Sequence, residues 1–315
     1  AYAGATGRVP MMPEYAMGFW QCKLRYQTQE ELLSIAREYK KRGLLISVIV
    51  VDFFHWPHQG DWRFDEKYWS RDAVKAMTDE LHAMGTKVMV SVWPSVDKRS
   101  ENYYEMEQKA LMSTTDVGSV QTYDYEGDCG TVDFFNPEAQ EFVWGKCKQN
   151  YRDWGIDLFW LDNSEPDSTK YDFENYRYYT GRGSKVGCEY PKKYVEAFYN
   201  GQEAEGDHEA VNLCRSAWVG SQKYRTLVWT GDVQSNFESF KDQVISGQNM
   251  GLAGIPWWTT DIGGFNGGDI HDPYFHEVLV RWFQGASHTL VSVRSVLPYP
   301  AYARKPRPRL GYPQA

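Results

Sequence analysis

The feature that most constrains the fold of this chain is a regular alternation of short apolar runs with longer helical segments. Runs such as Leu-Ile-Ser-Val-Ile-Val-Val at 45–51 and Lys-Val-Met-Val-Ser-Val at 87–92 are rich in β-branched residues, which is typical of strands covered on both faces. The segments between such runs carry apolar residues at three- and four-residue spacing, as amphipathic helices do. This alternation predicts βα units around a parallel sheet.

Seven strands and five principal helices are expected between Ala16 and Ile262. The expected strands are Ala16–Gln21, Leu45–Phe53, Lys87–Trp93, Leu158–Asp162, Ala210–Ala217, Thr226–Asp232 and Ile255–Ile262. The expected helices are Thr28–Arg42, Arg71–Met84, Pro137–Trp154, Pro191–Gln202 and Phe237–Asn249. Gly43 and Gly85 follow the first two helices, where a left-handed cap is expected.

Acidic and aromatic residues recur where these strands end, and this favours a (β/α)8 TIM barrel over an open doubly wound sheet. A barrel gathers its site at the carboxyl ends of its strands, and the residues found there are Asp52, Trp93, Asp162, Asp232 and Asp261. No Gly-x-Gly-x-x-Gly follows the first strand, so a dinucleotide-binding fold is disfavoured. The long segments 103–128 and 164–189 are expected to shape a site at the same end.

The carboxyl-terminal part of the chain loses the βα pattern. We expect the barrel domain to span residues 1–290, with a candidate eighth strand at 289–293 and an incomplete barrel if that strand is missing. Residues 291–315 are predicted to be a tail, because they are rich in Pro and Arg without apolar periodicity.

Composition narrows the class of ligand. Aromatic residues make up 16% of the chain, including 13 Trp, and such rings line clefts that bind sugars, although an aromatic-rich core is the alternative. The net charge of -8 argues against a nucleic-acid partner. The five cysteines are scattered without metal-binding spacing, so we expect mostly buried thiols and neither a metal nor another cofactor.

The sequence predicts no membrane partner. No run of 18 or more apolar residues is present, and no charged-then-apolar leader precedes Met11. The cellular compartment and the oligomeric state are left open by these observations.

Two strand-terminal carboxylates are candidates for glycoside hydrolysis, which requires a proton donor for the leaving oxygen and a nucleophile or activated water. Asp162 ends the buried run Leu158-Phe-Trp-Leu-Asp162, and Asp232 ends Val228-Trp-Thr-Gly-Asp232. Arg215 ends the strand between them, where its guanidinium could hold a sugar hydroxyl and a carboxylate. The alternatives are a capping role for Asp162 and a structural ion pair for Arg215.

An ordered set of motifs from Met12 to Gln284 resembles glycoside hydrolase family 31, the α-glucosidase and α-xylosidase family. Those nearest the carboxylates are Phe159-Trp-Leu-Asp162, Arg215-Ser216 and Trp229-Thr-Gly-Asp232. The others are Gly18-Phe-Trp-Gln21, Val50-Val-Asp52, Val92-Trp93, Trp257-Trp-Thr-Thr-Asp-Ile-Gly-Gly264 and Arg281-Trp-Phe-Gln284.

The resemblance implies a role for each matching residue. Asp162 would be the nucleophile and Asp232 the general acid/base of a retaining mechanism, with Glu165 as a supporting acid. The residues expected to bind or enclose an oligosaccharide substrate are Asp52, Trp93, Arg215, Trp229, Trp258, Asp261 and Phe265.

The chain also departs from the family. Members usually carry β-domains on both sides of the barrel, and their eighth strand has an Arg-x-His element, whereas 293–296 reads Val-Arg-Ser-Val. The motif Asp162-Asn-Ser-Glu-Pro166 is closer to the α-xylosidase form than to the α-glucosidase form. An α-xylosidase is therefore favoured, with an α-glucosidase or transglycosylase on α-glucans and a non-catalytic carbohydrate-binding fragment as alternatives.

Overall fold

A single parallel sheet organises the computed structural model, which describes residues 1–165, 173–286 and the backbone of 292–296. Its eight strands follow the order β12-β11-β10-β7-β3-β2-β1-β13. In chain order they are β1 (Phe19–Lys23), β2 (Val48–Val51), β3 (Lys87–Val92), β7 (Leu158–Leu161), β10 (Asn212–Cys214), β11 (Thr226–Trp229), β12 (Trp258–Thr259) and β13 (Ser292–Val296).

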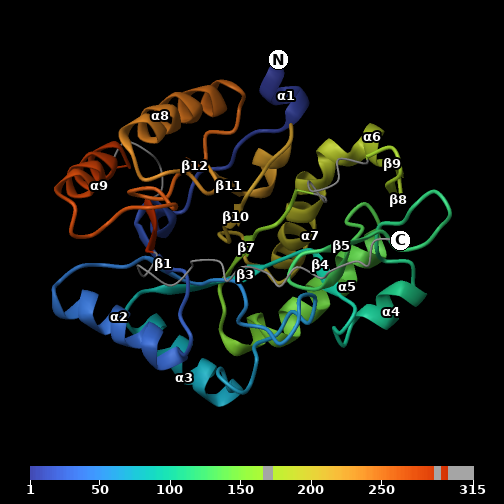
Figure 1. Cartoon of the computed structure of the whole chain (residues 1–315), viewed down its shortest axis with the longest axis horizontal. Helices are drawn as coiled ribbons and strands as arrows, with labels where there is room; N and C mark the ends of the chain where they lie inside the picture. The colour runs from blue at the N-terminus through green and yellow to red at the C-terminus, as the bar shows by residue number, and fades with distance from the viewer. Residues whose placement is uncertain (166–172, 287–291, 297–315) are drawn as a thin grey trace, which may run out of the picture.

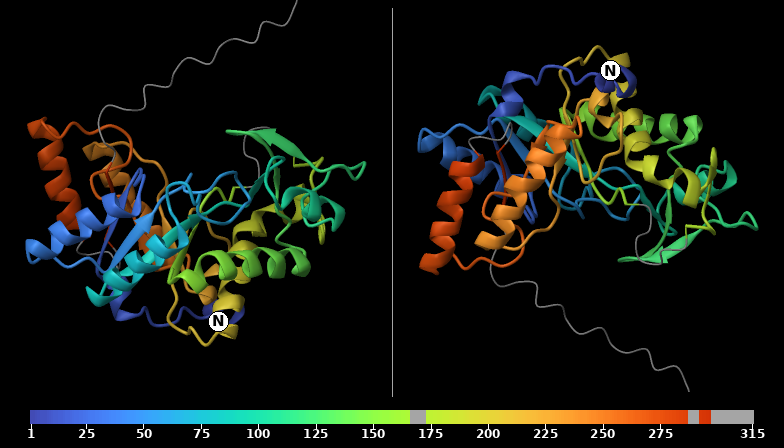
Figure 2. Two further views of the ribbon diagram at one scale, coloured as in Figure 1. Left: turned by 90° about the horizontal axis from the view of Figure 1, so that it is seen from below. Right: turned by 90° about the horizontal axis from the view of Figure 1, so that it is seen from above.

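Helices surround this sheet, as Figures 1 and 2 show. The longer ones are α2 (Gln29–Lys41), α3 (Arg71–Ala83), α5 (Pro137–Asn150), α7 (Tyr190–Ala204), α8 (Phe237–Leu252) and α9 (Pro273–Ala286). The shorter ones are α1 (Tyr2–Thr6), α4 (Tyr103–Gln108), α6 (Gly183–Val186), η1 (Glu14–Met17), η2 (Arg152–Trp154), η3 (Gly187–Glu189) and η4 (Ser221–Tyr224).

Caps mark the start of α2 and the ends of α2 and α3, and those at the two ends are the glycines expected for this role. The Thr28 side chain accepts a hydrogen bond from the backbone N–H of Glu31 at the start of α2, which is a typical N-cap. Gly43 and Gly85 adopt positive φ angles of 71° and 79° after α2 and α3. The expected helix at 137–154 is divided, because α5 ends at Asn150 and η2 follows it.

The predicted parallel sheet is confirmed, but several strands are shorter than predicted. The expected first strand, Ala16–Gln21, is shifted because residues up to Met17 form η1 and β1 begins at Phe19. The strands expected at 210–217 and 255–262 are reduced to β10 and β12. Their flanking residues continue into loops at the two ends of the sheet.

The eighth strand is present at Ser292–Val296 and pairs in parallel with β1. It overlaps the expected range 289–293 at residues 292 and 293 and continues to Val296, while 289–291 lie outside the described residues. Within the described part of the chain, no ladder joins β12 to β13, so the sheet is an incomplete (β/α)8 barrel. The division into a barrel at 1–290 and a tail stays a prediction, and β13 falls inside the range assigned to that tail.

Two smaller sheets come from the long segments that follow strands of the barrel. An antiparallel sheet with the order β4-β6-β5 joins β4 (Ser95–Asp97), β6 (Asp128–Thr131) and β5 (Thr122–Asp124). A short pair joins β8 (Arg177–Tyr178) to β9 (Gly181–Arg182). The first of these sheets folds the expected loop 103–128 back over the end of β3.

Alternating strand residues divide the core into an inner and an outer layer. Val48 and Val50 of β2 belong to an inner cluster with Leu213, Leu227 and others, which fills the space enclosed by the sheet. Ile49 and Val51 belong to the cluster between the sheet and the helices. This two-residue period explains why the β2 run is apolar throughout.

Four of the five cysteines are buried, as expected, and Cys188 is exposed; none forms a disulfide. No helix in the described ranges is long and apolar enough to cross a membrane.

Candidate active site

The two-residue period of the strands brings the predicted site residues to the inner face of the sheet at its carboxyl end. Asp52 follows Val48 and Val50 of the inner cluster, and Asp162 follows Leu158 in the same way. The same alternation continues from β3, β10, β11 and β12 to Trp93, Arg215, Trp229 and Asp261. Side chains far apart in the sequence therefore face one enclosed space.

Asp162 is buried, with 7% of its surface exposed. Its Oδ2 accepts a hydrogen bond of 3.0 Å from Trp93 Nε1, whereas Oδ1 has no hydrogen-bond partner among the described residues. Burial raises the pKa of Asp162 to about 6, although the positive charge of Arg215 acts in the opposite direction. One oxygen is thus fixed by a hydrogen bond, and the other faces Arg215 at 3.6 Å.

Arg215 connects the two predicted catalytic acids. Its Nη1 lies 3.6 Å from Asp162 Oδ1 and 3.4 Å from Asp232 Oδ1, and its Nε donates a hydrogen bond of 2.6 Å to Glu165. Burial would lower the pKa of Arg215, but these three carboxylates raise it, so the guanidinium stays charged. Both acids therefore lie within 4 Å of the same guanidinium nitrogen.

Asp232 is far more accessible than Asp162, because 45% of its side chain is exposed. Gly231 precedes it with a φ of 75°, a left-handed conformation that favours glycine and lets the chain turn after β11. The backbone oxygen of Asp232 accepts a hydrogen bond of 2.8 Å from Asn266 Nδ2. The acid is held in position while its carboxylate remains open to solvent.

Asp52 and Asp261 complete the set of acids on the inner face. Burial raises the pKa of Asp52 well above its ordinary value, and the nearby charges of Asp162 and Asp261 add to this effect. Burial likewise raises the pKa of Asp261 to about 7, with a further contribution from Asp232. A carboxyl group that keeps its proton can both donate to and accept from a sugar hydroxyl.

Aromatic rings form a wall around Trp93. The Phe53 ring stacks on Trp93 with 5.0 Å between ring centroids, and the rings of Phe54 and Trp56 each lie 5.5 Å away. Because Trp93 also donates to Asp162, this wall directly adjoins the candidate nucleophile.

Tyr125 was missed by the sequence analysis. It lies between β5 and β6, and its ring centroid is 5.7 Å from that of Trp93. Burial raises the pKa of its phenol, and so do the charges of Asp162, Glu126 and Asp232. Segment 103–128 was expected to shape the site, but the pairing that selects Tyr125 within it is not evident from local sequence.

The remaining predicted residues lie in different places. The Trp229 ring lies beneath the Arg215 guanidinium, 5.4 Å from its carbon to the ring centroid. The backbone N–H of Phe265 donates a hydrogen bond to the backbone oxygen of Val233, the residue after Asp232. The Trp258 ring packs against α8, so closely that a Cβ added at Gly247 of that helix would lie 2.7 Å from the ring. The structure does not bring Trp258 to the carboxylates.

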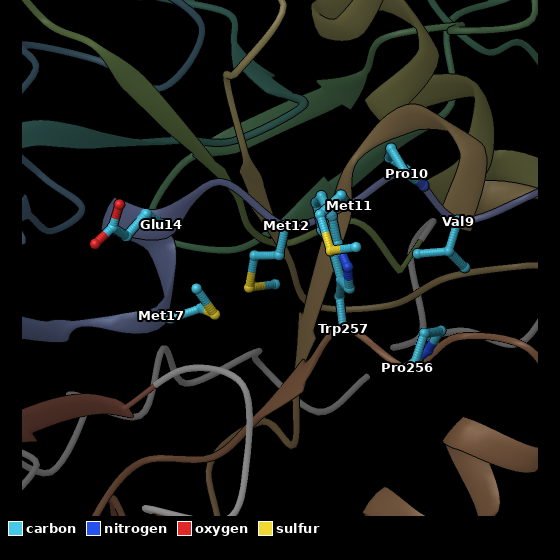
Figure 3. A pocket seen from close by; sticks show the side chains of 8 residues that line it. All are labelled: Val9, Pro10, Met11, Met12, Glu14, Met17, Pro256 and Trp257. Carbon is cyan, nitrogen blue, oxygen red and sulfur yellow. The ribbon is translucent and has the colours of Figure 1, made fainter.

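A larger hollow of about 550 Å³ lies at the other end of the sheet, before β1 and β12 (Figure 3). Figure 3 shows mainly apolar side chains around it, including those of Met11, Met12, Met17 and Trp257, with Glu14 as the one titratable group among the lining residues. It contains none of the carboxylates described above, so it is a poor candidate for the chemistry. Within the described ranges, no three His, Cys, Asp or Glu side chains gather in a way that could hold a metal ion.

Comparisons with known proteins agree with this fold. Residues 9–293 match the model of the glycosyl hydrolases family 31 TIM-barrel domain. The chain is 54% identical over 285 residues, 90% of its length, to an uncharacterized family 31 glucosidase of Pseudescherichia vulneris, and it spans 54% of that protein. It is 35% identical to an alpha-xylosidase of Saccharolobus solfataricus, covering 90% of this chain and 38% of the relative.

A solved structure gives a similar result. The GH31 alpha-xylosidase from a soil metagenome, complexed with xylose, is 54% identical with a TM-score of 0.89, and the match covers 93% of this chain and 43% of that one. The chain therefore spans about half or less of the length of these relatives.

Proposed function

The chain belongs to family 31 of the glycosyl hydrolases, and on this premise we propose that it is the catalytic barrel of a retaining α-glycosidase that releases terminal α-linked xylose. The observation that carries the proposal is the arrangement around Asp162. One oxygen is held by Trp93 and the other has no hydrogen-bond partner among the described residues, and Arg215 Nη1 lies close to both Asp162 and Asp232.

In the first step, Asp162 Oδ1 attacks the anomeric carbon while Asp232 protonates the leaving glycosidic oxygen. A buried carboxylate fixed by Trp93 and faced by Arg215 suits a nucleophile, because its geometry is set before the substrate binds. The bond between the sugar and the leaving group breaks as the bond to Asp162 forms, which leaves a covalent glycosyl ester and an ionised Asp232.

In the second step, Asp232 removes a proton from water, which attacks the anomeric carbon and releases Asp162. The exposure of Asp232 supports this role, because the acid must be reached first by the leaving group and then by water. Asp52 and Asp261, with their raised pKa values, are suited to hold the sugar hydroxyls through carboxyl groups that keep their protons. Two successive displacements at one carbon retain the anomeric configuration.

The preference for xylose rests on the aromatic wall and on the named relatives. Phe53, Phe54 and Trp56 follow Asp52 closely and crowd the space beside Trp93, where an additional hydroxymethyl group would have to fit. The similar soil-metagenome enzyme is an alpha-xylosidase complexed with xylose. An α-glucosidase is the second candidate, because the relative from Pseudescherichia vulneris is named a family 31 glucosidase. A pocket that excludes one group also discriminates only about 10- to 200-fold.

Proton NMR of the reaction with p-nitrophenyl α-xyloside and α-glucoside tests this proposal. We expect faster release from the xyloside, with α-xylose appearing before its β-anomer, and loss of turnover in both Asp162→Asn and Asp232→Asn. Asp79→Asn, which changes an exposed acid on α3, serves as the control. Initial release of β-xylose would contradict retention, and xylose binding without turnover in the folded chain would favour a binding fragment.

A further inference from the structure

A second pocket lies at the carboxyl end of the sheet, next to the aromatic wall. It has a volume of about 280 Å³ and is formed by residues after β1, after β2 and on the β4-β6-β5 sheet. Its lining consists of Arg25, Phe54, Trp56, Pro57, His58, Gln59, Asp97, Arg99 and Glu126. This volume is near the lower end of the roughly 300 to 1,000 Å³ typical of small-molecule sites, so it suits a single sugar ring.

This pocket is close to the proposed nucleophile. Phe54 and Trp56 line it, and both of their rings lie 5.5 Å from the Trp93 ring, whose Nε1 donates to Asp162. Two residues of the pocket lining therefore pack against the ring that is hydrogen-bonded to the candidate nucleophile. A ligand with one unit at Asp162 could therefore place the next unit in this pocket.

The pocket is held together by hydrogen bonds on its far side. Gln59 is buried, and its side-chain oxygen accepts a hydrogen bond from Ser95 Oγ. Its Nε2 donates a hydrogen bond of 2.7 Å to the backbone oxygen of Tyr125. Arg99 forms two side-chain hydrogen bonds with Asp97. These contacts fix the segment carrying Tyr125 against the loop after β2, so the pocket exists before a ligand binds.

Two side-chain donors in the lining have no hydrogen-bond partner in the described ranges. Arg25 Nη1 and Trp56 Nε1 are buried and have no hydrogen-bond partner among the described residues. Among the described residues, Arg25 forms no salt bridge. Its guanidinium carbon instead lies over the rings of Phe53 and Phe54, 5.5 and 5.0 Å from their centroids. Buried donors without partners are costly, and their presence beside a pocket points to a ligand with oxygen acceptors.

The charges of the lining favour a neutral ligand. Asp97 is neutralised by Arg99, and Glu126 lies in the same lining as Arg25, so the pocket carries two acids and two arginines. A hydroxyl pair of a pyranose accepts hydrogen bonds from a planar guanidinium while its ring packs on aromatic faces. We propose that Arg25, with Trp56, binds the hydroxyls of a neutral sugar unit attached to the xylosyl unit that is cleaved, so that Arg25 determines the preference for oligosaccharides over simple xylosides.

This inference rests on the proposed function. Two substrates that share the xylosyl unit but differ in the leaving group distinguish the role of Arg25 from a general loss of activity. Arg25→Met in the full chain removes the guanidinium but keeps an apolar stem over Phe53 and Phe54. We expect kcat/KM for α-xylosyl-(1→6)-glucose to fall roughly 10- to 100-fold, as for a lost hydrogen bond to a charged group, mainly through KM. The same variant should change kcat/KM for p-nitrophenyl α-xyloside less than about two-fold, because that leaving group lacks the hydroxyls.

Controls keep the result interpretable. Arg25→Gln also removes the guanidinium but keeps a polar side chain and should weaken the disaccharide selectively, and it provides a second test if Arg25→Met does not fold. Arg37→Met makes the same change in the exposed pairs of α2 and should leave both substrates unaffected. An unchanged disaccharide, or equal losses on both substrates in folded variants, would overturn the proposal.

A chain that cleaves neither substrate would refute the proposed function, and calorimetric titration with the same disaccharide then decides the inference separately. A roughly ten-fold or greater loss of affinity in Arg25→Met, with none in Arg37→Met, supports it. Equal affinity in wild type and Arg25→Met overturns it.

Discussion

Replacing Asp162 by Asn should stabilise the folded protein at neutral pH while removing its activity. Burial raises the pKa of Asp162 from its ordinary value of 3.8 to about 6. The unfolded chain releases this proton near pH 3.8 and the folded protein keeps it to about pH 6, so the unfolded state binds fewer protons between these values. The free energy of unfolding therefore falls as the pH rises through this window.

The magnitude follows from the shift. A difference of about two pKa units, at 1.36 kcal/mol for each, corresponds to about 3 kcal/mol at pH 7.5 and about 1 kcal/mol at pH 4.5. Asn carries no charge, and its oxygen can still accept the hydrogen bond from Trp93. The stability of Asp162→Asn relative to wild type should therefore increase by about 2 kcal/mol between pH 4.5 and pH 7.5.

Urea denaturation followed by tryptophan fluorescence at these two pH values measures the effect. Asp79→Asn, which removes an exposed charge, should show no comparable pH dependence, and kcat of Asp162→Asn should fall on the order of 10⁴-fold. A pH-independent difference, or a variant less stable than wild type at pH 7.5, would show that burial does not perturb this carboxyl.

Three further predictions concern the same acids. The kcat/KM of the wild type should fall as the pH drops through about 6, because Asp162 must be ionised to attack, and an acid limb below pH 4 would contradict this. Trp93→Phe removes the donor to Asp162 Oδ2 and should lower kcat/KM roughly 10-fold or more, whereas Trp229→Phe, which changes a ring beneath Arg215, should have a smaller effect in the same steady-state assay. Arg215→Met removes the cation that lowers the pKa of Asp162 and should move the acid limb to higher pH, while Arg215→Lys should restore part of the shift; an unmoved limb in a folded variant would exclude this electrostatic role.

The barrel and the strand-terminal acids could be predicted from the same feature of the sequence, the apolar runs of the central strands. Apolar runs covered on both faces identify central strands, and the residue that follows each run lies at the carboxyl end of the sheet. Asp52, Trp93, Asp162 and Arg215 were accessible to this reasoning. Strand lengths were less accessible, since β10 and β12 end where loop contacts replace the ladder.

The two-residue period of the strands could have corrected the assignment of Trp258 to the site. It could not have identified Tyr125, Gln59 or Arg25. Trp257 and Asp261 share a face with the inner cluster, so the alternation places Trp258 toward α8. Tyr125, Gln59 and Arg25 depend on pairing between distant segments, such as the hydrogen bond from Gln59 to Tyr125. No local pattern reports such contacts, because they follow from the way the β4-β6-β5 sheet folds over the end of β3.

The central claim is that Asp162 is the nucleophile, and trapping the covalent intermediate tests it most directly. The full chain is treated with 5-fluoro-α-xylosyl fluoride or its glucosyl counterpart, digested, and analysed by peptide mass spectrometry. A single label on Asp162, formed faster with the xylosyl reagent and absent from Asp162→Asn, is the predicted result. A label on Asp232 or Glu165, or no label on a folded chain that hydrolyses xylosides, would contradict it.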